Sequence, residues 1–234
     1  MSNSKKKYPC VILARGGSKG IPKKNLKEVA GKPLLEWTIT QALESKLIDS
    51  VWVSTDNEEI KDLSNSLGVN VILRPENISA DQSTSESGWL HSLNELEKKG
   101  LCIDAILAPQ CTSPVRESID FDNALLHFEK KNLDSLFSAT ELPDFNLWES
   151  NIDKKLSSIN YDYLNRKRRQ DHSKNQYLEN GSFYIFKPQT LKQYNNRLGG
   201  NIGFYCMDFW KSFQIDNWED IKFCEVIIQN YLNR

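Results

Sequence analysis

The feature that most limits the fold of this chain is the alternation of strand-like and helix-like segments in its first 140 residues. The strand-like segments are short apolar runs, and the helix-like segments place apolar residues at helical spacing. Short connections join them, which predicts an α/β fold with a doubly wound, mainly parallel sheet and right-handed crossovers. The expected strands cover residues 11–14, 51–56, 69–73, 103–108 and 133–140, and the expected helices cover residues 33–45, 57–63, 83–98 and 118–131.

The first expected strand runs into a loop of glycine and basic residues, Arg15-Gly-Gly-Ser-Lys-Gly-Ile-Pro-Lys-Lys-Asn25. Glycines let a backbone close around a ligand and present its N–H groups, and the basic side chains add positive charge. Such a loop after a strand is typical of a phosphate site, so we expect a nucleoside triphosphate site here. The loop lacks the spacing of a Walker A motif and of a dinucleotide-binding motif. A solvated basic surface loop is the alternative that its composition leaves open.

Polar side chains follow the other expected strands as well. In a parallel sheet, ligands bind beyond the carboxyl ends of the strands, near the point where the strand order reverses. We therefore expect four polar segments to gather at one edge, and this clustering favours the phosphate site over the surface loop. They are residues 15–25, Ser54-Thr-Asp56, Arg74 and Gln110-Cys-Thr-Ser-Pro-Val-Arg116.

Composition excludes several classes of protein. The 234 residues suit one α/β domain, 1–234, and the formal net charge of -1 provides no basic field for nucleic acid or an acidic membrane. No apolar run approaches the length of a membrane span, and residues 1–7 lack the apolar core of a signal peptide. The five cysteines form no Cys-x-x-Cys pair, and they predict reduced residues of a cytoplasmic protein.

The second half of the chain interrupts the alternation. Residues 142–178 are rich in Asn, Asp, Lys and Tyr and contain short alternating pieces, so we expect an inserted β-rich arm that meets a second copy in a homodimer. Its basic run at residues 166–169 has a solvated face as the alternative reading. Strands are expected again at residues 180–186 and from Ile202, and a last helix through Leu232 has Asp216 as its expected N-cap.

Several of these segments, taken in their order along the chain, resemble those of the cytidylyltransferases that activate nonulosonic (sialic-type) acids. The loop Val11–Asn25 is similar to the family signature Ile-Pro-Ala-Arg-Gly-Gly-Ser-Lys-Gly-Ile-Pro-x-Lys-Asn. Further blocks follow in the family's order: Gly31-Lys-Pro-Leu-Leu-Glu-Trp-Thr-Ile, Val53-Ser-Thr-Asp, Leu73-Arg-Pro-Glu, Ser79-Ala-Asp-Gln-Ser-Thr-Ser, Gln110-Cys-Thr-Ser-Pro-Val-Arg, Asn180-Gly-Ser-Phe-Tyr-Ile and Ile215-Asp-x-x-x-Asp. The resemblance implies a Rossmann-like fold of the nucleotide-diphospho-sugar transferase type.

The resemblance also implies the reaction of CTP with a nine-carbon 2-keto sugar acid to give a CMP-sugar and pyrophosphate. The anomeric hydroxyl attacks the α-phosphate in line, so the protein must neutralise phosphate charge and align the two partners. The triphosphate would be held by Arg15, Gly17, Ser18, Lys19 and Lys24, with Lys24 nearest the reacting phosphate. The cytidine and its ribose would contact Asn25, Arg74, Ser85 and Gln110. Mg²⁺ would bridge the phosphates, with Asp216 as its ligand and electrostatic anchor.

Two departures from the family pattern affect the site: one is at the metal motif, and the other is Phe145-Asn-Leu-Trp148, which lacks a basic residue that the family often has there. Gln214 stands where the metal motif usually has Asp, so it offers an oxygen without charge. On the sugar side, Arg169 with Gln170 matches the pair that would meet the sugar carboxylate, and Asn180 and Tyr184 match the edge of the sugar pocket, which Gln110 also borders. The identity of the nonulosonic acid stays open. The alternatives are another sugar nucleotidyltransferase, such as the ketodeoxyoctonate type, and a non-catalytic relative that binds CTP or a CMP-sugar.

Overall fold

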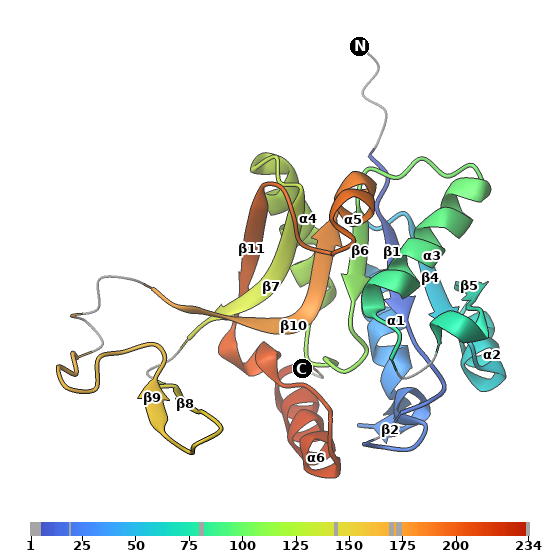
Figure 1. The fold of residues 1–234 in the computed structure, drawn as a ribbon. Helices are drawn as coiled ribbons and strands as arrows, with labels where there is room; N and C mark the ends of the chain where they lie inside the picture. The colour runs from blue at the N-terminus through green and yellow to red at the C-terminus, as the bar shows by residue number, and fades with distance from the viewer. Residues whose placement is uncertain are drawn as a thin grey trace.

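A seven-stranded sheet forms the centre of the molecule (Figure 1), whose computed structural model describes residues 6–18, 20–79, 82–142, 145–168, 171 and 175–232. The strand order is β11-β7-β10-β6-β1-β4-β5, in which β10 is antiparallel to both neighbours and all other pairs are parallel. The predicted doubly wound, mainly parallel sheet is confirmed. The strands are β1 (Pro9–Leu13), β4 (Ser50–Thr55), β5 (Asn70–Leu73), β6 (Ile106–Pro109), β7 (Ser135–Glu141), β10 (Tyr177–Phe186) and β11 (Ile202–Met207).

Helices cover both faces of this sheet because successive residues of each strand point to opposite faces. On β1, Ile12 packs with one buried cluster and Val11 with another. The first cluster receives side chains of α1 (Leu34–Glu44), α2 (Glu58–Ser66) and α4 (Ser118–Lys130). The second receives side chains of α3 (Ser85–Lys98) and α5 (Pro188–Tyr194). The sheet is therefore buried on both faces, as its continuous apolar strands require.

The chain turns back at the centre of the sheet, between β1 and β6. From β1 it proceeds outward to β4 and β5, and then returns through α3 to β6 on the other side of β1. The loops after β1 and β6 consequently lie side by side at the carboxyl ends of adjacent strands. This is the switch point at which an α/β sheet binds its ligands.

The arm expected at residues 142–178 leaves the main sheet as a separate hairpin, β8 (Trp148–Ser150) paired with β9 (Leu156–Ser158). Figure 1 shows this hairpin away from the sheet, connected to it by the long ends of β7 and β10. One boundary differs from the prediction, because β10 begins at Tyr177 and pairs with Glu141 of β7. The arm is therefore continuous with the main sheet at its base.

The last helix begins one residue later than expected. In α6 (Trp218–Ile227) the N-cap is Asn217, whose side chain accepts hydrogen bonds from the backbone N–H groups of Glu219 and Asp220. The predicted Asp216 cap is wrong because the Asp216 carboxylate is turned toward Lys24. A π-helical turn, Ile228–Leu232, ends the element.

Several short elements were not predicted from the sequence: 3₁₀ turns at Lys24–Leu26 (η1), Glu76–Ile78 (η2) and Phe209–Ser212 (η4), and the small ladder of β2 (Glu28–Val29) with β3 (Lys32–Pro33). Helix α5 was not predicted either, although Pro188 begins it in the position that proline favours. Over the described residues, no helix combines the length and apolar character that a membrane crossing needs.

Candidate functional site

Hydrogen bonds between its backbone and two side chains fix the conformation of the loop after β1. The N–H of Gly16 donates to Asp56 Oδ1 at 2.9 Å, and Asn25 Nδ2 donates to the carbonyl of Arg15 at 2.9 Å. Lys23 adopts a left-handed conformation (φ 52°) immediately before the η1 turn, which carries Lys24. At Gly20 a Cβ atom would lie 2.6 Å from the carbonyl oxygen of Asp216, so only glycine fits this approach of two segments.

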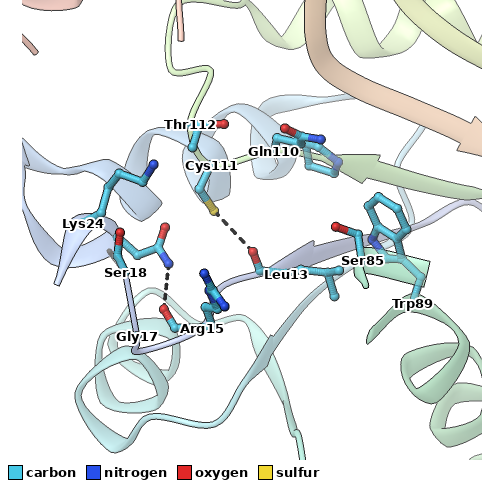
Figure 2. A pocket seen from close by; sticks show the side chains of 12 residues that line it. Leu13, Arg15, Gly17, Ser18, Lys24, Ser85, Trp89, Gln110, Cys111 and Thr112 are labelled. Atoms are coloured by element: carbon cyan, nitrogen blue, oxygen red, sulfur yellow. Dashed lines mark hydrogen bonds between the residues drawn. The ribbon is translucent and has the colours of Figure 1, made fainter. Parts of the chain in front are cut away.

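A cavity of about 240 Å³ lies between this loop, the loop after β6 and the first turns of α3 (Figure 2). Seven of the residues predicted to bind nucleotide line it: Arg15, Gly17, Ser18, Lys24, Asn25, Ser85 and Gln110. Figure 2 shows the cavity with Lys24, Ser18 and Arg15 toward one end and Gln110, Ser85 and Trp89 toward the other. The cavity is thus cationic at one end, and its other end carries the amide of Gln110, the hydroxyl of Ser85 and the ring of Trp89.

A second cavity of about 300 Å³ adjoins the first and shares Leu13, Arg15 and Ser85 with it. Arg74 lines this second cavity, and its guanidinium donates to Ser54 Oγ at 3.2 Å and to the Ser54 carbonyl at 2.7 Å. Burial lowers the pKa of Arg74, while the nearby Asp56 carboxylate acts in the opposite direction. Arg74 is therefore fixed to the end of β4, where it lines the second cavity.

The segment Gln214–Asp216 closes the cationic end. Lys24 Nζ donates to the carbonyl of Ile215 at 2.9 Å and to Asp216 Oδ1 at 3.0 Å, and the Asp216 side chain is 73% exposed. The N–H of Ile215 donates to the carbonyl of Thr112 at 2.7 Å. Gln214 Nε2 donates to the carbonyl of Asn180 at 2.5 Å. The segment is thereby attached to the loop after β1, to the loop after β6 and to β10.

Asp216 and Gln214 suit a magnesium ion that takes most of its ligands from water and from the phosphate oxygens of a bound molecule. No group of three or more Asp, Glu, His or Cys side chains lies close enough together to bind a metal ion within the described ranges. Mg²⁺ usually takes one or two protein carboxylates and completes its shell with water and phosphate oxygens. The exposed carboxylate of Asp216 beside a cationic cavity fits that pattern. The amide nitrogen of Gln214 is already used, so its oxygen is the atom that it could offer.

Further residues line the first cavity that were not assigned as binding residues, although Cys111 and Thr112 belong to a block expected at this edge: Leu13, Trp89, Pro109, Cys111 and Thr112. The sequence carried signals for two of them. Trp89 follows Ser85 by four residues, which places both on one face of α3. Thr112 follows Gln110 in the same polar block. Burial raises the pKa of the Cys111 thiol to about 11, so this side chain is a neutral part of the wall.

The residues predicted for the sugar side are placed differently. Asn180 and Tyr184 are buried: Asn180 Oδ1 accepts from Ser138 Oγ at 2.6 Å, and the Tyr184 hydroxyl donates to Glu179 at 2.6 Å. Neither lines the two cavities described above. Arg169 and Gln170, like Lys19 of the phosphate loop, lie outside the described residues.

The sheet with its cavity at the switch point defines the class of this protein, an α/β protein of the doubly wound type with a ligand cavity at the carboxyl edge. Residues 9–232 match a family model described as cytidylyltransferase. The chain belongs to this cytidylyltransferase family.

Relatives with known names agree with that assignment. An N-acylneuraminate cytidylyltransferase of Oncorhynchus mykiss is 36% identical over 208 residues, which are 88% of this chain and 46% of that protein. The chain thus spans about half the length of this relative. A post-translational flagellin modification protein B of Campylobacter coli is 30% identical over 225 residues, 94% of each chain.

Solved structures agree in fold. A CMP:2-keto-3-deoxy-manno-octonic acid synthetase complexed with CTP has a TM-score of 0.71 at 15% identity and covers 95% of this chain and 98% of its own. A 4-diphosphocytidyl-2C-methyl-D-erythritol synthase from Anaerococcus prevotii has a TM-score of 0.65 at 16% identity and covers 96% of this chain and 97% of its own. At these identities the likeness concerns the fold alone.

Proposed function

We propose that this protein transfers the cytidylyl group of CTP to a nonulosonic acid and releases pyrophosphate. The observation that carries the proposal is the polarity of the first cavity, with Arg15 and Lys24 at one end and Gln110 and Ser85 at the other. Cations suit the triphosphate, and an amide with a hydroxyl suits the hydrogen-bonding edge of a pyrimidine. The names of the relatives, N-acylneuraminate cytidylyltransferases, support the acceptor class.

The chain's own residues would act mainly on phosphate charge and alignment. Arg15 presents a planar guanidinium that can bind two phosphate oxygens at once. Lysine has three donors, and Lys24 uses two of them on Ile215 and Asp216. We assign the third to an oxygen of the α-phosphate, where negative charge grows as the anomeric hydroxyl attacks. Because Ile215 and Asp216 fix the ammonium group, little reorganisation is needed when the substrate binds.

Magnesium belongs to this proposal as a cofactor, with Asp216 as the protein ligand and Gln214 as a second oxygen donor. When bound, the ion would offset the negative charge of the phosphates. The exposed position of Asp216 leaves room for such an ion together with its water molecules.

The acceptor would be bound by residues near the arm. Arg169 and Gln170 remain our predicted partners of the sugar carboxylate, and Asn180 and Tyr184 our predicted edge of the sugar pocket. Since both Asn180 and Tyr184 are buried here, they would support the pocket wall or require a rearrangement to touch the sugar.

We propose that the arm forms a homodimer contact with a second copy of the chain. Large apolar side chains on the arm are exposed, which is costly in water unless a partner covers them: Trp148, Ile152, Leu156, Ile159, Tyr163 and Leu164. Sedimentation of the intact protein at micromolar concentration tests this, and a monomeric mass would contradict it. A cytoplasmic location is part of the proposal, and it is consistent with five cysteines that are all free.

Pyrophosphate release from CTP and Mg²⁺ tests the function directly, with a panel of nonulosonic acids and with ketodeoxyoctonate as acceptors. Turnover with ketodeoxyoctonate alone would favour the alternative function, a sugar nucleotidyltransferase of the ketodeoxyoctonate type. CTP binding without turnover on any acceptor would favour a non-catalytic relative.

A further inference from the structure

Arg116 is a buried cation beside the candidate nucleotide site. It is 1% exposed, and it stands at the end of the loop that follows β6. In the part of the chain that the structure describes, no carboxylate lies within ion-pair distance of its guanidinium. A buried charge without a directly paired counter-charge is costly, so the position calls for an explanation.

The guanidinium of Arg116 donates to neutral acceptors on the loop after β6, on β10 and on α1. Nη1 donates to the carbonyls of Gln110 at 2.9 Å, Ser113 at 2.5 Å and Ser182 at 3.2 Å, and Nη2 donates to Thr38 Oγ1 at 2.6 Å. The front of the same loop lines the cavity with Gln110, Cys111 and Thr112. The positive charge therefore lies directly behind the wall that the ligand would touch.

Burial lowers the pKa of Arg116 to about 10, while the Asp120 carboxylate acts in the opposite direction, and the group stays protonated at neutral pH. The low polarity of the interior strengthens its field, because the interaction of two charges grows as the effective dielectric constant falls. Lys211 is another buried cation of this region, and it forms direct ion pairs: its Nζ lies 2.8 Å from Asp120 and 2.6 Å from Glu117. Lys211 is thus paired directly with carboxylates, whereas among the described residues Arg116 is influenced only by the more distant carboxylate of Asp120, which Lys211 already binds.

We propose that Arg116 is a positioning residue that also supplies a buried positive charge for the polyphosphate in the neighbouring cavity. Its hydrogen bonds hold the conformation of the loop from Gln110 to Ser113. The phosphates of a bound nucleotide lie on the other side of this loop and serve as the counter-charge of Arg116. This inference rests on the proposed function, since it requires that an anionic nucleotide occupies the cavity. It predicts that the contribution of Arg116 grows with the charge of the ligand.

The test compares the affinities of cytidine, CMP, CDP and CTP, measured by calorimetry, for the wild type and two variants. Arg116→Gln removes the charge and keeps an amide donor for the carbonyls, whereas Arg116→Lys keeps the charge and loses the planar fork. We expect Arg116→Gln to weaken CTP at least tenfold and cytidine less than threefold, with CMP and CDP between them. We expect Arg116→Lys to bind CTP within threefold of the wild type.

A matched control loosens the same loop without changing charge. Gln41 Nε2 donates to the carbonyls of Pro114 and Arg116, each at 2.8 Å, so Gln41→Leu removes two contacts of the loop. We expect Gln41→Leu to change all four affinities by a similar factor.

Two outcomes overturn the inference. One is an equal loss for cytidine and CTP in Arg116→Gln, which would show a structural role alone. The second outcome applies if Arg116→Gln does not fold. A loss of affinity in Arg116→Lys that is above tenfold and equal for cytidine and CTP would then exclude a role for the charge of Arg116. A wild type that binds none of the four ligands would instead contradict the proposed function.

Discussion

Replacing Lys24 by methionine separates the role of this residue in catalysis from its role in stability. The side chain is 16% exposed, and its ammonium group contacts the Ile215 carbonyl and the Asp216 carboxylate. Methionine keeps most of the aliphatic stem and removes the charge. The variant therefore loses one ion pair, one hydrogen bond to a carbonyl and the proposed contact to the α-phosphate.

The two effects have different sizes. Because Asp216 is 73% exposed, water screens the ion pair, and pairs of this kind contribute about 0–1 kcal/mol to stability. The hydrogen bond to Ile215 adds about 1 kcal/mol. Against these, methionine removes the cost of a partly buried ammonium group, so we expect a net loss near 1 kcal/mol, or about 2–4 °C in Tm. Loss of a donor to transition-state charge typically lowers kcat by about 100- to 1000-fold.

Pyrophosphate release and thermal unfolding of Lys24→Met measure both effects, and the neighbouring Lys23 provides the control. Lys23 Nζ pairs with Glu59 at 2.6 Å, its side chain is 64% exposed, and it does not line the cavity. Lys23→Met should leave kcat within about twofold, as expected for a surface pair. A Lys24→Met enzyme with kcat within fivefold of the wild type, or equal losses in the two variants, would refute the reasoning.

Three further predictions concern other parts of the chain. Gln214→Asp adds a carboxylate beside Asp216 and should lower the Mg²⁺ concentration needed for half-maximal pyrophosphate release several-fold; an unchanged magnesium requirement would exclude Gln214 from the metal site. If turnover rose instead from near zero, the wild type would be a degenerate enzyme. In the native protein, a thiol reagent should modify the exposed Cys102 and Cys206 quickly and Cys111 slowly, because burial raises the pKa of Cys111 to about 11 and keeps it protonated; fast labelling of Cys111 would contradict this placement. Burial also raises the pKa of Tyr184 above its ordinary value, and its hydrogen bond with Glu179 adds to this. The stability that follows is fully present below about pH 10 and is lost as the pH rises further, so Tyr184→Phe should flatten the fall in unfolding free energy above about pH 10; an unchanged slope there would count against it.

The alternating pattern and the polar loops were sufficient to predict the doubly wound sheet and most of the cavity. Both depend on local signals: apolar runs for strands, and charged or glycine-rich segments directly after them. Because parallel strands end at one edge, residues as distant as Arg15, Arg74 and Gln110 could be expected together from the sequence, whereas Ser85 was expected from the family resemblance alone.

Other features depend on contacts that no local pattern reveals. The N-cap of α6 is Asn217 and not the predicted Asp216 because Lys24, almost 200 residues away in the sequence, binds the Asp216 carboxylate. Among the described residues, Arg116 has no directly paired carboxylate because the loop after β6 meets neutral acceptors of α1 and β10. Burial of Tyr184 likewise results from packing against Trp89 and Arg197, which come from α3 and from the segment after α5.

The most direct test of cytidylyl transfer is the release of pyrophosphate by the wild-type protein from CTP and Mg²⁺, measured with each nonulosonic acid of a panel and compared with UTP and GTP. The account predicts release with at least one of these acids and a clear preference for CTP. Folded protein that releases no pyrophosphate with any acid, or that prefers another nucleotide, would contradict it.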